Sequence, residues 1–381
     1  AQALLAGLFV SIPLGNLLFW GNYNVLADPA DPTDGLLGQF GPFYHFDLLA
    51  PVAIFGAAGL LTCWRDRGIV RSRVQTVLPD STPGNGRAIA LSLLLVAVLV
   101  LGGVNAALVG GPLDRNLAHT ETYEEAYAPF EAGAYVNGTD ASGTQTKTLV
   151  FLPAPYGDWL NHPFQYLRND PGFDGQTVYA LDRWPESNFA VIDATPARDH
   201  YRYTFHGEWT ANPDERVVIP RVEALSVRRG ERLAGETVVG VPAGVEHATV
   251  RLETDAGHGS AAVATPGEEV AVDWSLTETG VTLDEVDDST VSNGSVALVG
   301  TDTVELTIRL SQSAAGSLTY RQETAVRPTA RGVEAIWPPA RSVCPLVSDC
   351  DNEGTYLPDR PEHHFEGVSF DTSLRPSTRT E

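Results

Sequence analysis

The sequence predicts an α-helical transmembrane segment of three spans, followed by an extracytoplasmic α/β module and an antiparallel β-sandwich. Three observations support this fold class. Three long apolar runs lie within residues 1–111, short strand-like runs around a polar stretch follow over 112–215, and Val/Thr-rich runs separated by Gly, Pro and Asp recur over 216–330. Long apolar runs are typical of membrane helices, whereas short alternating runs between turn residues are typical of antiparallel strands.

The expected spans are residues 2–20, 46–64 and 88–109. Each approaches the roughly 20 residues that a helix needs to cross the hydrocarbon core of a bilayer. Trp20 and Trp64 stand at span ends, where aromatic residues mark the interface between lipid and water. Buried core helices are the alternative, which the length and apolar character of these runs disfavour.

The short loops predict the orientation of the spans. The loop over 65–87 is rich in arginine, whereas the loop over 21–45 contains aspartates and no basic residue. Short loops rich in Lys and Arg stay in the cytoplasm. We therefore expect a multi-pass protein of the cell membrane, with the lipid bilayer as a partner and everything after about residue 110 outside the cytoplasm.

The charged residues have an unusual composition. The formal net charge is −23, and Lys147 is the single lysine among 25 basic residues. An acidic surface with little lysine suits concentrated salt, where the Debye length shrinks to roughly 3 Å and self-repulsion is screened. The composition therefore indicates a halophilic source, and it excludes nucleic acid as a partner because phosphates would be repelled.

The first residues also carry information. The chain has 381 residues, contains no methionine and begins with AQALLAGLFV. We therefore expect it to be the C-terminal part of a longer protein. Because no basic residues precede the first apolar run, that run is not interpreted as a signal peptide.

The α/β module is predicted from apolar periodicity. Residues 114–132 repeat aromatic and alanine side chains at three- and four-residue spacing, which predicts a helix. The runs over 148–153, 178–182 and 189–193 are short and apolar, which predicts three strands. Strands that alternate with a helical or irregular stretch form an α/β unit.

The last part of the chain carries a cysteine pair. Residues 331–381 form a Pro-rich C-terminal extension after the expected sandwich, and Cys344 and Cys350 lie close together within it. A disulfide is the expected pairing outside the cytoplasm. A metal site is the alternative, but the further ligands that zinc requires are lacking nearby.

A polar and aromatic stretch follows the strand predicted over 148–153. Its ligand-binding candidates are Tyr156, Asp158, Trp159, Asn161, His162, Arg168, Asn169 and Asp170. α/β units place ligand contacts after the carboxyl ends of strands, and aromatic rings beside Asp, Asn and His suit a sugar. The alternative is structural, because Asn-Asp-Pro-Gly forms turns and Asn-His-Pro begins or ends helices. A complete catalytic centre is not expected here.

Further candidates lie elsewhere in the chain. A cavity at the membrane surface is expected near the start of the second span, and its candidate residues are Asp34, Tyr44, His45 and Asp47. Ionisable groups at such a position line a functional cavity or anchor the helix. The candidate glycosylation sites, each in an Asn-X-Ser/Thr sequon, are Asn137 and Asn293.

Signals for metals and cofactors are weak. His200, His206 and Glu208 fall on one face of another strand-like stretch, where metal ligation and simple surface exposure are both open. The sequence contains no HExxH, GxSxG, P-loop or dinucleotide-binding pattern. No cofactor is evident and no metal site is assigned. The sequence leaves open whether the full-length protein uses a divalent metal.

Several segments together resemble a known family. They are GNYNVLADPADPTDG, GPFYHFDLL, LVFLPAPYGDWLNHPFQYLRNDPGFDG, VYALD and ATPARDHYRY. This combination resembles haloarchaeal polytopic membrane proteins related to glycosyltransferase family 39, the dolichyl-phosphate-mannose protein mannosyltransferase type (GT-C), which carry an uncharacterised C-terminal outside domain. The resemblance implies transfer of a sugar from a polyprenyl-phosphate carrier to a glycan or protein acceptor. The catalytic carboxylate of that family lies in an early outside loop that we expect upstream, so no catalytic residue is assigned.

Two functions of different classes follow from these observations. The first is the C-terminal part of a membrane glycosyltransferase, in which this chain supplies the last spans and an accessory domain that binds the acceptor. The second is a membrane-anchored surface protein that binds ligands or has a structural role without catalysis. A third and weaker hypothesis is an outside hydrolase that uses residues within 156–206.

Overall fold

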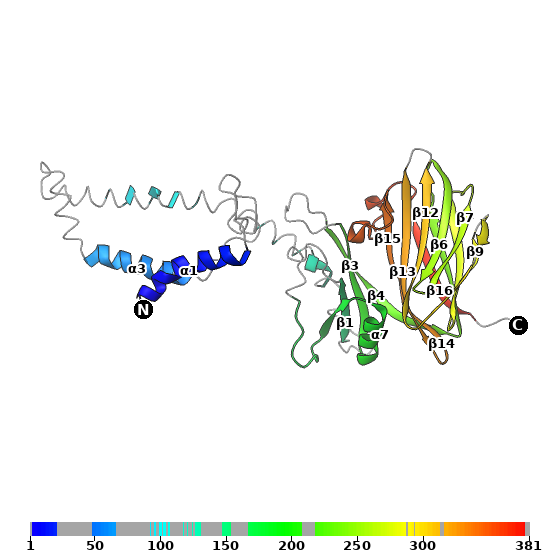
Figure 1. Ribbon diagram of the computed structural model, residues 1–381, viewed down its shortest axis with the longest axis horizontal. Helices are drawn as coiled ribbons and strands as arrows, with labels where there is room; N and C mark the ends of the chain where they lie inside the picture. Colours follow the sequence, from blue (N-terminus) through cyan, green and yellow to red (C-terminus); the bar gives the residue numbers. More distant parts are fainter. Residues whose placement is uncertain are drawn as a thin grey trace. The chain divides into compact units, whose positions relative to one another are not determined.

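The computed structural model describes residues 2–20, 48–65, 147–153, 167–207 and 218–377, with short gaps at 287–288, 293 and 313–315, together with scattered helical residues between 92 and 130. The chain divides into two compact units, residues 1–120 and 121–381, and each is described by itself. The second unit holds the β-sheets (Figure 1).

In the first unit, α1 (Gln2–Trp20) and α3 (Leu49–Arg65) contact each other, and the ring centroids of Phe9 and Phe55 lie 6.0 Å apart. Within the described residues, no helix has both the length and the apolar character needed to cross a bilayer.

The prediction of a three-span helical segment over 2–20, 46–64 and 88–109 is therefore wrong. At about 1.5 Å per residue, the 19 residues of α1 and the 17 residues of α3 reach about 28 Å and 26 Å, less than the hydrocarbon thickness of about 30 Å. Only isolated helical positions are described in the third run. The described fold is instead mostly β-sheet.

The second unit begins with a small parallel sheet. β1 (Thr148–Pro153) pairs in parallel with β2 (Thr177–Asp182) on one side and with β3 (Asp199–Gly207) on the other. β4 (Val218–Gly230) then pairs with β3 in the antiparallel sense. The strands expected over 148–153 and 178–182 are thus present as β1 and β2, and the parallel arrangement brings their carboxyl ends to one edge.

Both faces of β1 are covered, which explains its uninterrupted apolar sequence TLVFLP. Leu149 and Phe151 pack with Phe189 of α7 (Pro185–Ala194) on one face. On the other face, Val150 packs in a cluster with the helical segment 126–130. A buried parallel strand sandwiched by helical segments is a three-layer α/β arrangement.

The prediction of a strand over 189–193 is wrong, because these residues belong to α7. A five-residue apolar run does not by itself distinguish a buried strand from a helix. Pro185 at the start of the helix has the backbone geometry that favours initiation. Phe189 and Ile192 then stand three residues apart on the buried face, as a helix requires.

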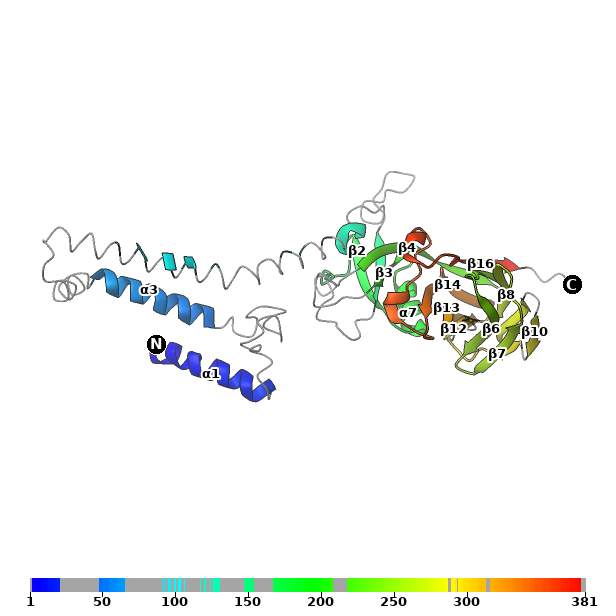
Figure 2. The same cartoon turned by 90° about the horizontal axis from the view of Figure 1, so that it is seen from above.

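Two sheets pack face to face in the second unit, and the larger one includes β1 to β4. The bounds of their strands are β5 (Arg232–Gly240), β6 (Val245–Thr254), β7 (Gly257–Val263), β8 (Glu269–Thr277), β9 (Gly280–Val286), β10 (Ser289–Ser292), β11 (Ser295–Ala297), β12 (Asp302–Gln312), β13 (Ser317–Thr329), β14 (Gly332–Trp337), β15 (Ala340–Pro345) and β16 (Phe370–Ser377). One sheet has the order β11-β9-β8-β5-β16, and the other has the order β10-β7-β6-β12-β13-β14-β4-β3-β1-β2, with β15 also paired to β13. Figure 2 shows β8 and β16 in one layer and β6, β7 and β12 in the other.

The core between these sheets contains a buried polar chain around an indole ring. The indole Nε1 of Trp274 donates to Thr237 Oγ1 at 3.0 Å, and that hydroxyl donates to Gln322 Oε1 at 3.1 Å. All three residues are almost fully buried. Gly235 leaves room for the indole, because a Cβ at this position would overlap the ring.

The large sheet runs without interruption from the α/β part into the sandwich. β4 pairs with β3 along one edge and with β14 along the other. The boundary expected at residue 216 therefore falls next to a strand that both parts share. Residues 331–381, expected as a Pro-rich extension, contribute β14, β15 and β16, and β16 forms the edge beside β5.

Candidate functional site

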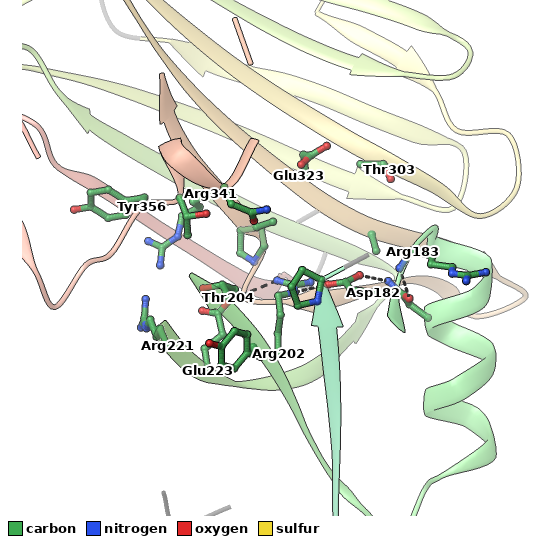
Figure 3. Close-up of a pocket in the computed structure, with 18 of the residues that line it drawn as sticks. Asp182, Arg183, Arg202, Thr204, Arg221, Glu223, Thr303, Glu323, Arg341 and Tyr356 are labelled. Carbon is green, nitrogen blue, oxygen red and sulfur yellow. Dashed lines mark hydrogen bonds and ion pairs between the residues drawn. The ribbon is translucent and has the colours of Figure 1, made fainter. Parts of the chain in front are cut away.

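A polar cleft of about 400 Å³ opens where the carboxyl ends of β1 and β2 meet β13, β15 and the segment after β15. Its charged lining residues are Asp182, Arg183, Arg202, Arg221, Glu223, Glu323, Arg341 and Asp351, and its other polar or aromatic ones include Asn188, Tyr203, Thr204, Thr303, Asn352, Thr355 and Tyr356. Figure 3 shows Arg341 and Tyr356 at one end and Asp182 and Arg183 at the other. The edge formed by the carboxyl ends of parallel strands is where α/β folds place ligands.

One wall of the cleft is a rigid ion cluster on β2, β3 and β4. Arg202 Nε lies 2.9 Å from Asp182 Oδ2, and Arg202 Nη1 lies 3.5 Å from Glu223 Oε1. Asn188 of α7 donates to the other oxygen of Asp182 at 2.6 Å. Arg202 also donates to the carbonyl of Pro338 at 3.1 Å, which ties this wall to the sandwich.

The charge of Arg202 is maintained although the side chain is buried. Burial acts against the charged form, but the carboxylates of Asp182 and Glu223 outweigh it and raise the pKa of Arg202 above its ordinary value. The guanidinium therefore stays charged, and its ion pairs hold it in place without a ligand. This wall is preorganised.

Arg341 of β15 has a different environment. Its Nη1 donates to the carbonyl of Phe370 at 2.7 Å, and its guanidinium lies 5.4 Å from the ring centroid of Tyr356 and 5.8 Å from that of Phe370. Among the described residues, no carboxylate lies within ion-pair distance of Arg341. Burial lowers its pKa, and the charge of Arg221 acts in the same direction against the opposing effect of Glu223.

A second hollow of about 210 Å³ adjoins the cleft and shares several of its residues, Arg341 and Glu323 among them. Here Arg321 binds three carboxylates, Glu305 at 2.9 Å, Glu323 at 3.0 Å and Asp349 at 2.7 Å. Burial raises the pKa of Glu323, and the neighbouring carboxylates add to this effect against the opposing charge of Arg321. Carboxylates exceed cations in this second hollow.

The cysteine pair shapes the end of the cleft. Cys344 and Cys350 form a disulfide that closes a short loop between β15 and the 3-10 helix η5 (Asp351–Gly354). Gly354 lies against this disulfide, and a side chain there would collide with both sulfur atoms. The disulfide therefore fixes the segment that carries Asn352, Thr355 and Tyr356 into the cleft.

Most of the residues proposed from the sequence lie outside the described residues. These are Asp34, Tyr44, His45, Asp47, Asn137, Tyr156, Asp158, Trp159, Asn161, His162, Glu208 and Asn293. Arg168, Asn169 and Asp170 are described, and none of the three lines the cleft.

Asn169 and Asp170 have structural contacts. Asn169 exchanges two hydrogen bonds of 2.8 Å with the backbone of Tyr179, as a neighbouring strand would. Asp170 accepts from the N–H groups of Asp174 at 3.1 Å and Gly175 at 2.9 Å, which closes the turn. Hydrogen bonds from the side chain of Asp174 and the backbone of Gly175 lower the pKa of Asp170 to about 2. The contacts of Asn169 and Asp170 are those of a structural turn, the alternative predicted from the sequence.

His200 and His206 lie on β3 but have separate partners. His200 lies 3.5 Å from Thr195 Oγ1, whereas His206 Nδ1 lies 2.8 Å from the carbonyl of Thr355. The His206 ring also lies 5.6 Å from that of His364 and 6.4 Å from that of His363. Over the described ranges, no group of three or more His, Cys, Asp or Glu side chains is arranged to hold a metal ion.

Sequence reasoning missed the main residues of the cleft. Arg202 stands between two tyrosines in DHYRYTF and Arg341 precedes a Val-Cys pair in ARSVCP. A charged residue inside an otherwise apolar strand pattern is the available signal, since such a residue needs a partner. The partners themselves are distant in sequence, as the contact between Arg202 and Pro338 shows.

The fold and the cleft define a β-rich module with a preorganised polar cleft at an α/β edge. In comparisons with known proteins, residues 148–324 match a family described as a domain of unknown function (DUF7846). The match includes Arg202 and Glu323 but ends before Arg341. No curated protein and no solved structure matches the chain. The comparisons therefore add no support to the resemblance to glycosyltransferase family 39.

Proposed function

We propose that residues 121–381 form an extracytoplasmic binding module that holds a saccharide in the cleft. The observation that carries the proposal is the composition of the cleft, in which a tyrosine ring and an arginine without a carboxylate partner face a fixed cluster of carboxylates and amides. Sugars present apolar C–H faces together with many hydroxyls. Aromatic faces and fixed polar groups are suited to both.

Preorganisation supports binding. The ion pairs and the amide hydrogen bond that hold Arg202, Asp182 and Asn188 form without a ligand. A ligand therefore meets groups whose rotamers are already restricted, which reduces the entropy lost on binding.

Binding is favoured over catalysis because three of the four carboxylates that line the cleft are held in ion pairs. Asp182 and Glu223 both pair with Arg202, and Glu323 pairs with Arg321. A general acid or base must be free to exchange a proton with the substrate. The same binding role suits an accessory domain that holds a sugar acceptor.

The extracytoplasmic location rests on two supports. The Cys344–Cys350 disulfide is typical of an oxidising compartment. The acidic composition keeps a surface hydrated in concentrated salt.

A glycan array tests the proposal with the full chain in concentrated salt. We expect binding to a restricted set of glycans, and a loss of about tenfold or more in affinity, about 1.4 kcal/mol, for Tyr356→Ala and Asn352→Ala, two residues that line the cleft. Arg309→Ala is the matched control, because Arg309 is exposed on β12 and does not line the cleft. No glycan binding, or binding that both cleft variants retain, would overturn the proposal.

A further inference from the structure

We infer that the saccharide carries a carboxylate, as a uronic acid does, and that Arg341 binds this carboxylate. The inference rests on the proposed function and adds the chemical class of the ligand. It comes from a comparison of the partly or fully buried arginines in the second unit.

Three other arginines with restricted exposure are neutralised by acids of the protein. Arg202 has two carboxylate partners, Arg321 has three, and Arg327 pairs with both Asp193 and Glu334. Arg341 has none within ion-pair distance in the described part of the chain, although its guanidinium lies beside two rings. In a chain with a net charge of −23, a partly buried arginine that lines a cleft without an ion pair calls for an explanation.

Hydrogen bonding leads to the same conclusion. Arg198 also lacks a carboxylate partner, but its guanidinium donates four hydrogen bonds of 2.9–3.1 Å to backbone carbonyls. Arg341 donates one, to Phe370. A guanidinium has five N–H donors, so most of those on Arg341 have no acceptor among the described residues. An acceptor from outside the protein is therefore expected in the cleft that Arg341 lines.

The orientation of Arg341 is set before the ligand arrives. The rings of Tyr356 and Phe370 and the carbonyl of Phe370 hold its guanidinium. Tyr356 is itself held, because its hydroxyl accepts the Phe370 N–H at 3.1 Å and its ring stacks on His364 with centroids 4.8 Å apart. A planar guanidinium held in one orientation matches a planar carboxylate through two parallel hydrogen bonds.

A carboxylate fits this site better than a phosphate. A phosphate monoester carries nearly two negative charges near neutral pH and is usually bound by several cations or backbone N–H groups. Glu223 and Glu323 also line the cleft, and Arg221 is already paired with Asp359 at 3.3 Å. Arg183 also lines the cleft, but it is exposed and its guanidinium lies 5.6 Å from the centroid of the Trp184 ring. Among the described lining arginines, Arg341 is the one that is partly buried and has no ion pair, and it can balance one negative charge.

The rest of the cleft suits the uncharged part of such a ligand. Its volume of about 400 Å³ falls within the roughly 300–1,000 Å³ typical of small-molecule sites. Asn352, Thr355 and Thr204 supply neutral donors and acceptors. These groups suit ring hydroxyls, while the carboxylate is directed to Arg341.

The test compares three probes by calorimetry with the full chain: an oligosaccharide of uronic acids, the same oligosaccharide after reduction of its carboxyl groups, and a phosphorylated neutral oligosaccharide. We expect the uronic acid form to bind at least tenfold more tightly than the reduced form. Arg341→Gln should abolish this preference and retain the weaker binding of the reduced form. Arg341→Lys keeps the charge without the planar fork and should retain only part of the preference.

The controls separate the two proposals. Arg309→Gln should leave the preference intact, and thermal unfolding of each variant shows whether it is folded. Equal binding of the acidic and reduced forms would overturn the inference and leave the proposed function in place. A preference for the phosphorylated probe would overturn the carboxylate assignment, and failure to bind any of the probes would count against both proposals.

Discussion

Two arginine–aspartate pairs with the same N–O distance show how burial should change the energetic contribution of an ion pair. Arg202 Nε lies 2.9 Å from Asp182 Oδ2, with side-chain exposures of 9% and 23%. Arg232 Nη2 lies 2.9 Å from Asp284 Oδ2, with exposures of 43% and 33%. Water solvates and screens the second pair much more than the first, so the pairs differ in burial rather than in length.

We predict that Arg202→Met lowers the free energy of unfolding by about 3–5 kcal/mol, because Asp182 and Glu223 are then left partly buried without their cation. Arg232→Met should cost about 0–1 kcal/mol, since Asp284 can be solvated by water. The predicted difference between the two variants is about 2–5 kcal/mol from these ranges.

Urea unfolding of the full chain, followed by tryptophan fluorescence, measures this difference. Trp274 is 1% exposed in the sandwich core and reports on loss of packing. The linear dependence on urea gives the free energy of unfolding, and an unchanged slope shows that the same surface is exposed in each variant. Equal losses for the two variants would refute the argument that burial determines the contribution of these pairs.

Three further predictions concern the disulfide, the core and the effect of pH. Replacing Cys344 and Cys350 by alanine should lower the free energy of unfolding by about 2 kcal/mol, the chain-entropy value for closing a loop of about seven residues. Urea unfolding measures this loss. A reducing agent should lower the free energy of unfolding of the wild type but not that of the double variant. Gly235→Ala should lower the thermal unfolding midpoint through a loss of about 1–3 kcal/mol, because the added methyl group overlaps the indole of Trp274. Gly267→Ala is the control, because an added Cβ there meets only an ordinary van der Waals contact with the Glu269 carbonyl at 3.8 Å. Equal midpoints for the two variants would contradict the prediction. Burial and two neighbouring histidines lower the pKa of His364. The contribution of His364 to stability is therefore complete above the unfolded pKa of about 6.5 and is lost as the pH falls from there through the lowered folded pKa. Unfolding midpoints measured across this pH range show the loss, and an unchanged dependence of the midpoint on pH in His364→Gln would argue against this assignment.

Local sequence patterns predicted several elements correctly because the relevant physics is local. The apolar run over 148–153 is present as β1, since a strand buried on both faces needs an uninterrupted apolar sequence. The pairing of Cys344 with Cys350 was expected from a separation of six residues. The Asn-Asp-Pro-Gly signal matched the turn that Asp170 closes.

Other predictions failed where several structures fit the same local pattern. The short apolar run over 189–193 fits both a buried strand and a helix, and the packing of α7 on the sheet decided in favour of the helix. The apolar runs at 2–20 and 46–64 indicated spans, but no helix among the described residues is both long and apolar enough to cross a bilayer. Hydropathy alone does not determine where a helix begins and ends.

The sequence by itself determined the acidic charge, the strand content of the second half and the disulfide, because each depends on composition or on residues close together in the chain. Only the tertiary structure decided the cleft. Arg202 meets the carbonyl of Pro338, 136 residues away, and Arg341 is set apart from acids by the rings and backbone that surround it. Whether a charged side chain is neutralised or left available depends on which distant strands become neighbours, and the pairing of β4 with both β3 and β14 determines this.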